Sequence, residues 1–153
     1  LLAVPHLLPL IEDLIEGSGV TILDQPEDLI PALQTSDAMI ATSGTITLQA
    51  ALCGTVGVTC YLTDAFSGFI GRRLVDLDKV ILPNAILGRP LYPFYFQEAA
   101  TGKTLAAATL DCLYDANAKS SARHAAIELK SLLTGGAQSF DELVIRALKK
   151  WLD

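Results

Sequence analysis

Four small residues, Thr42-Ser43-Gly44-Thr45, stand between an apolar run and a segment with helical character. The apolar run ends at Ala41 and predicts a buried strand, whereas residues 45–52 predict a helix that ends before Gly54. The first N–H groups of such a helix have no partner within it, and the helix dipole adds partial positive charge at that end. Because a glycine lets a ligand approach the backbone, the stretch is typical of an anion site, above all for phosphate.

The same residues also have a purely structural interpretation. A Ser or Thr in front of a helix often only caps it, which is worth about 1 kcal/mol. Taken alone, the residues favour this capping role over a phosphate site. The choice between them depends on where the loop lies in the fold.

Other side chains with catalytic or metal-binding potential are few. His6 and His124 have no carboxylate and nucleophile at a spacing that suggests a catalytic set, so both are interpreted as structural or solvated. The three cysteines, Cys53, Cys60 and Cys112, lack the paired spacing of a zinc site or a disulfide framework and are expected to be buried thiols. The sequence therefore predicts neither a metal nor a cofactor.

Strand and helix signals alternate through the first 100 residues, and only helices are expected after them. The expected strands are 1–4, 20–23, 38–41, 56–60 and 80–82, and the expected helices are 7–15, 26–33, 45–52, 66–74, 103–114, 118–133 and 140–152. A loop or broken helix, rich in proline and aromatic residues, is expected over 88–97. This order predicts an α/β fold with a Rossmann-like parallel sheet, helices on both faces and a C-terminal helical tail over 101–153.

In an open parallel sheet, ligands bind beyond the carboxyl ends of the strands. The predicted order of elements places two segments at that edge. They are the loop at Thr42–Thr45 and the Pro83-Asn84 pair, which follows the expected fifth strand. One ligand is therefore expected to contact both.

Composition limits the functional classes. The chain of 153 residues suits a single domain, and 51% hydrophobic with 18% charged residues predicts that some apolar surface meets a partner domain, a second subunit or a membrane surface. A net charge of −6 argues against nonspecific nucleic-acid binding. No apolar run is long enough for a spanning helix, and no charged signal region is present, so a cytoplasmic location is expected. The start at Leu1, directly on a strand signal, predicts a fragment of a longer protein.

Four ordered segments resemble the C-terminal half of lipid-A-disaccharide synthase. They are Ala41-Thr-Ser-Gly-Thr-Ile-Thr-Leu-Gln-Ala-Ala-Leu-Cys-Gly54, then Arg72-Arg73-Leu-Val75, then Ile81-Leu-Pro-Asn-Ala-Ile-Leu-Gly-Arg-Pro-Leu91 with Phe96-Gln97-Glu98. The resemblance extends from about residue 20 to residue 133, and the ordered set is more specific than any one segment. It implies half of a two-domain GT-B glycosyltransferase, here the half that binds the nucleotide sugar.

The resemblance also implies the reaction and its partners. Members of this family transfer 2,3-diacylglucosamine from its UDP derivative to 2,3-diacylglucosamine 1-phosphate, without a metal, in lipid A biosynthesis. For this chain it implies a UDP-sugar donor, an acylated sugar acceptor, peripheral contact with the inner membrane from the cytoplasm, and a homodimer. The catalytic base is expected in an acceptor domain outside this chain, so the fragment alone is expected to be inactive.

Seven residues are carried over to the UDP-sugar site by the resemblance. Ser43, Gly44 and Thr45 would line the diphosphate, where backbone N–H groups stabilise the charge that grows on the leaving group. Further candidates are Gln49, Asn84, Arg89 and Gln97. For Asn84 a turn-holding role is an equal alternative, and an Arg in a Gly-Arg-Pro turn is commonly only a solvated charge.

Two positions depart from the family pattern. Gln49 stands where related transferases carry a glutamate suited to the ribose hydroxyls, and Leu62 follows Tyr61 where the family has an arginine. A neutral amide keeps an acceptor oxygen but loses charge-assisted strength. Two alternatives follow: another UDP-sugar GT-B enzyme such as a 2-epimerase, and a noncatalytic nucleotide-binding or scaffold module.

Overall fold

The structure is a computed structural model that describes residues 1–3, 5–23, 25–63, 80–134, 144–145 and 148–149. Its centre is a parallel sheet of three described strands in the order β1(Met39–Thr42), β2(Gly57–Tyr61) and β3(Phe94–Phe96). Met39 pairs with Gly57 at one end of the register, and Tyr61 pairs with Phe96 at the other. The predicted α/β class with a parallel sheet is confirmed.

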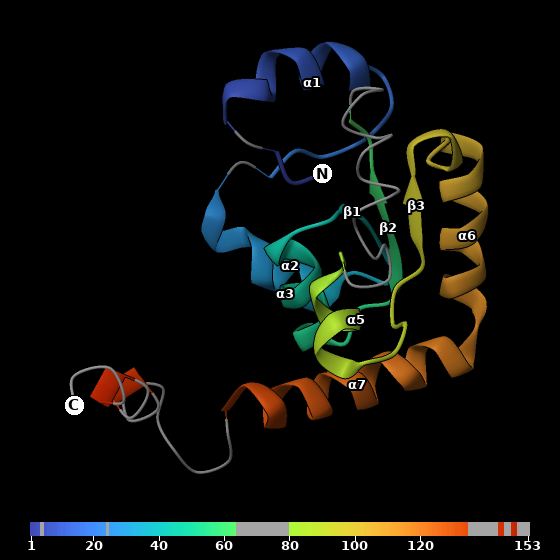
Figure 1. The fold of residues 1–153 in the computed structure, drawn as a ribbon. Coiled ribbons are helices and arrows are strands. Elements are labelled where there is room, and N and C mark those ends of the chain that lie inside the picture. The colour runs from blue at the N-terminus through green and yellow to red at the C-terminus, as the bar shows by residue number, and fades with distance from the viewer. Residues whose placement is uncertain (4, 24, 64–79, 135–143, 146–147, 150–153) are drawn as a thin grey trace.

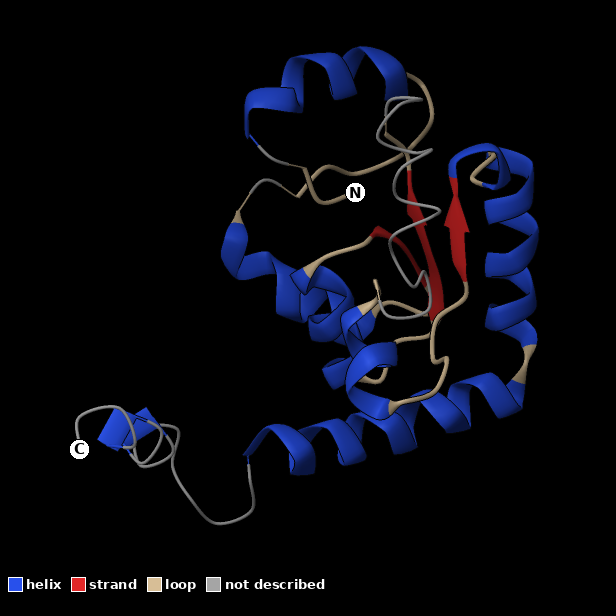
Figure 2. Ribbon diagram, in the orientation of Figure 1, coloured by secondary structure: helices blue, strands red, loops and turns tan. Residues whose placement is uncertain are grey.

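Helices cover both faces of this sheet (Figures 1 and 2). The helix α3(Thr45–Cys53) returns from β1 along one face with α2(Leu29–Thr35) beside it, and α6(Gly102–Tyr114) contacts the central strand β2 from the other face. The long helix α7(Ala116–Thr134) then crosses below the sheet and packs on α3, α5(Leu82–Leu87) and α6. This arrangement confirms the expected helices at 45–52, 103–114 and 118–133 to within a few residues.

The core lies between α3, α7 and the sheet. Its fully or nearly fully buried side chains are Leu33, Met39, Ala50, Ala51, Ile81, Tyr92 and Leu129. Small residues on α3 allow α7 to approach closely. Gly54 also lies against α7, as a Cβ built at this position would be only 3.6 Å from Cα of Arg123. This packing anchors the helix whose first turn follows the Ser-Gly-Thr loop.

The N-terminal segment forms helices mostly as expected, but strand pairing there is minimal. A short 3-10 turn, η1(Pro5–Leu7), leads into α1(Leu8–Ile15), and η2(Pro26–Asp28) leads into α2. The strands expected at 1–4 and 20–23 reduce to one parallel bridge between Leu2 and Leu23 among the described residues. The signal in these segments is apolar but short, and pairing depends on neighbouring strands that local sequence does not reveal.

Two further expectations are wrong. Residues 80–82 do not form a strand: Leu82 begins the helix α5, because Pro83 fits the first turn of a helix, where its missing N–H is not needed. The segment 88–97, expected as a loop or broken helix, contains the strand β3. The expected helix at 66–74 lies outside the described residues, as does most of the one at 140–152.

Candidate functional site

The loop after β1 lies at the carboxyl edge of the sheet. The N–H group of Ser43 donates to the carbonyl of Cys60 at 3.3 Å, which extends the pairing of β1 with β2 by one residue. Gly44 then occupies the N-cap position of α3, and no side chain accepts a hydrogen bond from the first turn at this cap. The structure therefore removes the simple capping interpretation, because neither Ser43 nor Thr45 caps the helix.

Gly44 has a backbone that requires glycine. Its φ of 144° and ψ of −166° lie in a region that other residues rarely adopt. A Cβ built at this position would meet no atom within 4 Å. The glycine thus sets the direction of the turn and leaves open space beside the helix N-terminus.

Thr47 holds this turn from inside the protein, a role that the sequence reading missed. Its buried hydroxyl donates to the carbonyl of Gly44 at 2.7 Å, and its N–H donates to the same oxygen at 3.2 Å. Thr45 remains exposed, and Gln49 is half-buried one turn further along α3. The sequence signal for this role is a threonine at the third position of the helix, from which a hydroxyl can donate to a backbone carbonyl three residues earlier.

Asn84 lies elsewhere in the fold. It sits on α5, 6% exposed, and its Oδ1 accepts from the N–H groups of Leu91 and Tyr92 at 2.9 and 3.0 Å. Its Nδ2 donates to the carbonyl of Tyr92 at 3.0 Å. These bonds fix the turn that precedes β3, which is the amino side of the sheet. The expected placement of Asn84 at the carboxyl edge is therefore wrong, because the residue ends no strand, and a contact with the donor stays a prediction.

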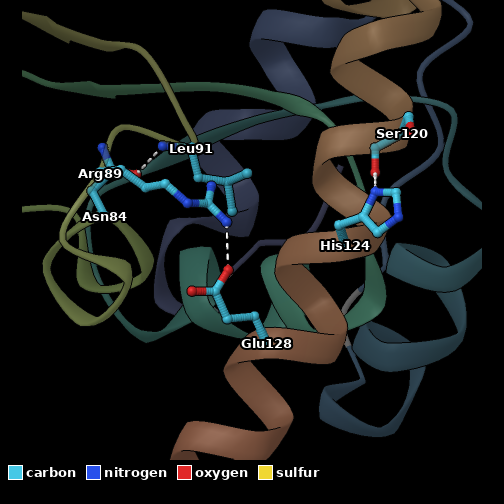
Figure 3. Close-up of polar contacts among 6 residues, drawn as sticks. All are labelled: Asn84, Arg89, Leu91, Ser120, His124 and Glu128. Atoms are coloured by element: carbon cyan, nitrogen blue, oxygen red, sulfur yellow. Dashed lines mark hydrogen bonds and ion pairs between the residues drawn. The ribbon is translucent and has the colours of Figure 1, made fainter.

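Arg89 also lies on this side (Figure 3). It pairs with Glu128 of α7, and the two side chains are 41% and 46% exposed. The ion pair joins the turn after α5 to α7 and contributes little because solvent screens it. His124, one turn before Glu128, is solvent-exposed, and its Nδ1 donates a hydrogen bond to the carbonyl of Ser120 at 2.9 Å.

Gln97 follows β3 at the carboxyl edge. Its Oε1 accepts from the N–H of Thr63 at 3.1 Å, and its Nε2 donates to the carbonyl of Thr63 at 2.9 Å. The structure thus brings Ser43, Gly44 and Thr45 to one turn, with Gln97 at the end of the sheet strand two places away. It separates Asn84 and Arg89 from that group.

The buried polar groups of the amino side form a connected set. The Tyr92 hydroxyl donates to the carbonyl of Thr55 at 2.7 Å, and the Thr55 hydroxyl donates to the carbonyl of Leu33 at 2.7 Å. Burial, with a smaller contribution from Cys53, raises the pKa of Tyr92, which keeps its hydroxyl protonated as a donor. This set ties β3 and β2 to α2.

Other site chemistry is sparse in the part of the chain that the structure describes. No group of three or more His, Cys, Asp or Glu residues there could hold a metal ion. The described helices also include none that is both long and apolar enough to cross a bilayer. The cysteines are free and half-buried, and burial raises the pKa of the Cys60 and Cys112 thiols.

Comparison with known proteins assigns the chain to a family. The sequence profile of the family described as lipid-A-disaccharide synthetase matches residues 15–147. The chain belongs to the lipid-A-disaccharide synthetase family. It is similar to the lipid-A-disaccharide synthase of Rhodopseudomonas palustris, with 33% identity over 88% of this chain and 35% of that protein.

Two other synthases match over nearly the whole chain. The enzyme of Nitrosococcus oceani is 30% identical over 95% of this chain and 40% of its own length. The enzyme of Paraburkholderia xenovorans is 34% identical over 97% of this chain and 39% of its own length. The chain thus spans about two-fifths or less of the synthases that it matches, and it is a lipid A biosynthesis glycosyltransferase homologue.

Proposed function

We propose that this chain is the donor-binding part of a lipid-A-disaccharide synthase and that the turn after β1 holds the diphosphate of a UDP-sugar. The observation that carries the proposal is the family match over residues 15–147, which includes this turn. The geometry supports it: α3 starts without a side-chain cap, at the sheet edge where ligands of parallel sheets bind.

The turn offers two groups of interactions to a diphosphate. Backbone N–H groups at the start of α3, including that of Thr45, donate hydrogen bonds and act together with the helix dipole. The hydroxyls of Ser43 and Thr45 supply further donors. When the bond to the sugar breaks, negative charge grows on the UDP leaving group, and donors fixed in advance stabilise it without reorganising.

Gln49 is proposed to face the nucleotide from the second turn of α3. It is half-buried, and its side chain makes no hydrogen bond to another residue within the described parts of the chain. Its amide oxygen can accept from one ribose hydroxyl, more weakly than a carboxylate would. Asn84 and Arg89 are weaker candidates in the structure, since their described contacts hold the turn after α5.

Calorimetric titration of the 153-residue chain with UDP tests the proposal. Thr45 is the first residue of α3, a position where proline is compatible with a helix, so Thr45→Pro removes one N–H group and the hydroxyl while keeping the helix. Thr45→Ala is the matched control because it removes the hydroxyl and keeps the N–H.

We expect UDP binding that falls about tenfold in Thr45→Pro and less in Thr45→Ala. Equal losses in both variants would assign the affinity to the hydroxyl. Absence of binding at millimolar UDP would contradict the donor role and support a noncatalytic scaffold module.

The remaining partners are proposed from the family. An acylated sugar acceptor, a catalytic base from another part of the enzyme, and contact with the inner membrane from the cytoplasm would complete the reaction. We expect no turnover by this chain alone in a glycosyltransferase assay. Exposed apolar side chains such as Leu14, at 75%, and Ile127, at 69%, support packing against a second copy, which light scattering can test.

A further inference from the structure

Gln97 has an unusual backbone for its residue type. Its φ of 52° makes it the one non-glycine residue with positive φ within the described ranges. A side chain with a Cβ is disfavoured in this region, so the surrounding contacts must hold it there. The residue directly follows β3 and is the first residue of the 3-10 turn η4(Gln97–Ala99).

The side chain of Gln97 makes the two hydrogen bonds that the backbone of a neighbouring strand would make. The regular pairing of β2 with β3 ends at Tyr61 and Phe96, whose rings stack at 6.5 Å between centroids. Two residues further along, Thr63 has both its N–H and its carbonyl bonded to the Gln97 side chain, at 3.1 and 2.9 Å. The side-chain carboxamide of Gln97 therefore pairs with Thr63 as a backbone peptide group would, at a point where β3 has already ended.

These bonds fix the exit of β2 at the edge that carries the proposed anion site. On its other side, β2 receives the Ser43 N–H at the Cys60 carbonyl. The exits of β1, β2 and β3 are thus joined in a row, by Ser43 with Cys60 and by Thr63 with Gln97.

We propose that Gln97 is a positioning residue that holds the exit of β2 beside the Ser43–Thr45 turn. This inference rests on the proposed donor function, but it assigns Gln97 a role other than direct contact with UDP. The oxygen and the nitrogen of its amide are both engaged with Thr63, so the group acts on the phosphate site through the backbone.

Two variants separate the parts of this interaction. Gln97→Ala removes both bonds to Thr63. Gln97→Glu keeps an acceptor for the Thr63 N–H but replaces the donor with a carboxylate oxygen that faces the Thr63 carbonyl. Tyr92→Phe is the matched control because it removes one hydrogen bond, to the Thr55 carbonyl, on the opposite side of the sheet.

Two measurements on the 153-residue chain test the proposal: hydrogen exchange of the Thr63 amide by NMR, and UDP affinity by calorimetry. For Gln97→Ala we expect exchange at Thr63 to rise at least tenfold and UDP affinity to fall about fivefold, a modest loss since the donors of α3 stay in place. Gln97→Glu should lie between Gln97→Ala and the unchanged chain in both measurements. Tyr92→Phe should change neither.

The contrary outcomes are distinct. Unchanged exchange at Thr63 with weaker UDP binding would show that Gln97 contacts the nucleotide directly. Faster exchange with unchanged UDP affinity would show that the link does not serve the site, and either result overturns the inference. Failure of the unchanged chain to bind UDP would instead overturn the proposed function together with this role, even where exchange at Thr63 confirms the link.

Discussion

Gly44 and Gly57 stand at opposite ends of the sheet, and each is a glycine for a different reason. At Gly57, where β2 begins, a Cβ would lie 2.2 Å from the carbonyl oxygen of Met39. At Gly44, after β1, it would meet nothing within 4 Å, and the requirement is the backbone conformation. One glycine closes the contact between two strands, whereas the other keeps a turn open to solvent.

The polar groups of the two ends differ in the same way. Before β2 and β3, Thr55, Tyr92 and Asn84 are at most 6% exposed, and their side chains are hydrogen-bonded to backbone groups. After β1, Thr45 is exposed and the helix start lacks a side-chain cap. The polar groups at the amino end of the sheet are therefore paired within the protein, whereas the start of α3 at the carboxyl end has no side-chain cap, as the proposed site requires.

The largest effect is expected from Gly57→Ala. The added Cβ would overlap the backbone of Met39, so the pairing of β1 with β2 must shift. We expect a loss of about 3 kcal/mol or more in the free energy of unfolding, measured by urea denaturation. A loss below about 1 kcal/mol would show that the strands separate easily at this end.

Asn84→Ala should come next. It leaves the buried N–H group of Tyr92 and the partly buried N–H group of Leu91 without their acceptor, at a cost of about 2 to 3 kcal/mol in unfolding free energy. Urea denaturation measures the loss, and a UDP titration of the folded variant shows whether Asn84 also serves the donor. Unchanged stability would contradict the role in holding the turn.

Gly44→Ala should destabilise less and affect the ligand more. The strained backbone costs about 1 to 2 kcal/mol, and the methyl group enters the open space, so UDP affinity should fall about tenfold. Gly19→Ala is the matched control, because Gly19 also has positive φ, at 73°, and open space around it. If both variants lower UDP affinity equally, the loss is a general effect of backbone strain, and the turn at Gly44 has no specific role in binding UDP.

The smallest effect concerns the thiols. Burial raises the pKa of Cys60 and of Cys112, where Asp111 and Asp115 add to it, so less reactive thiolate is present at a given pH. We expect alkylation at pH 8 to be several-fold slower than for a free thiol and to accelerate as pH rises, measured by mass spectrometry. UDP should protect Cys60, beside the turn, and leave Cys112 unchanged.

Local sequence was sufficient for the elements with strong periodicity or clear termini. The helix at 45–52 and the strand before it follow from a run of apolar residues, a small-residue turn and Gly54, which takes the left-handed conformation at the helix end. The Ser-Gly-Thr turn and its place at the carboxyl edge follow from the same pattern, because a strand followed by a helix in a parallel sheet has one allowed geometry.

Local sequence failed where a segment depends on distant partners. Phe94–Phe96 becomes a strand because β2 provides the pairing edge, and Leu82 begins a helix because Pro83 suits a first turn. Taken alone, the apolar residues of these two short segments are compatible with a strand and with a helix.

By itself, the sequence determined the fold class, the family and the turn that carries the proposed phosphate site. Only the tertiary structure decided which candidate side chains lie near that turn. Gln97 lies at the carboxyl edge, whereas Asn84 lies on α5 and Arg89 on the turn after it, away from that edge. The physical reason is that amide groups removed from solvent, almost fully at Asn84 and partly at Gln97, need hydrogen-bond partners within the protein. Those partners, Thr63 for Gln97 and Tyr92 for Asn84, are set by packing between segments that the sequence alone does not bring together.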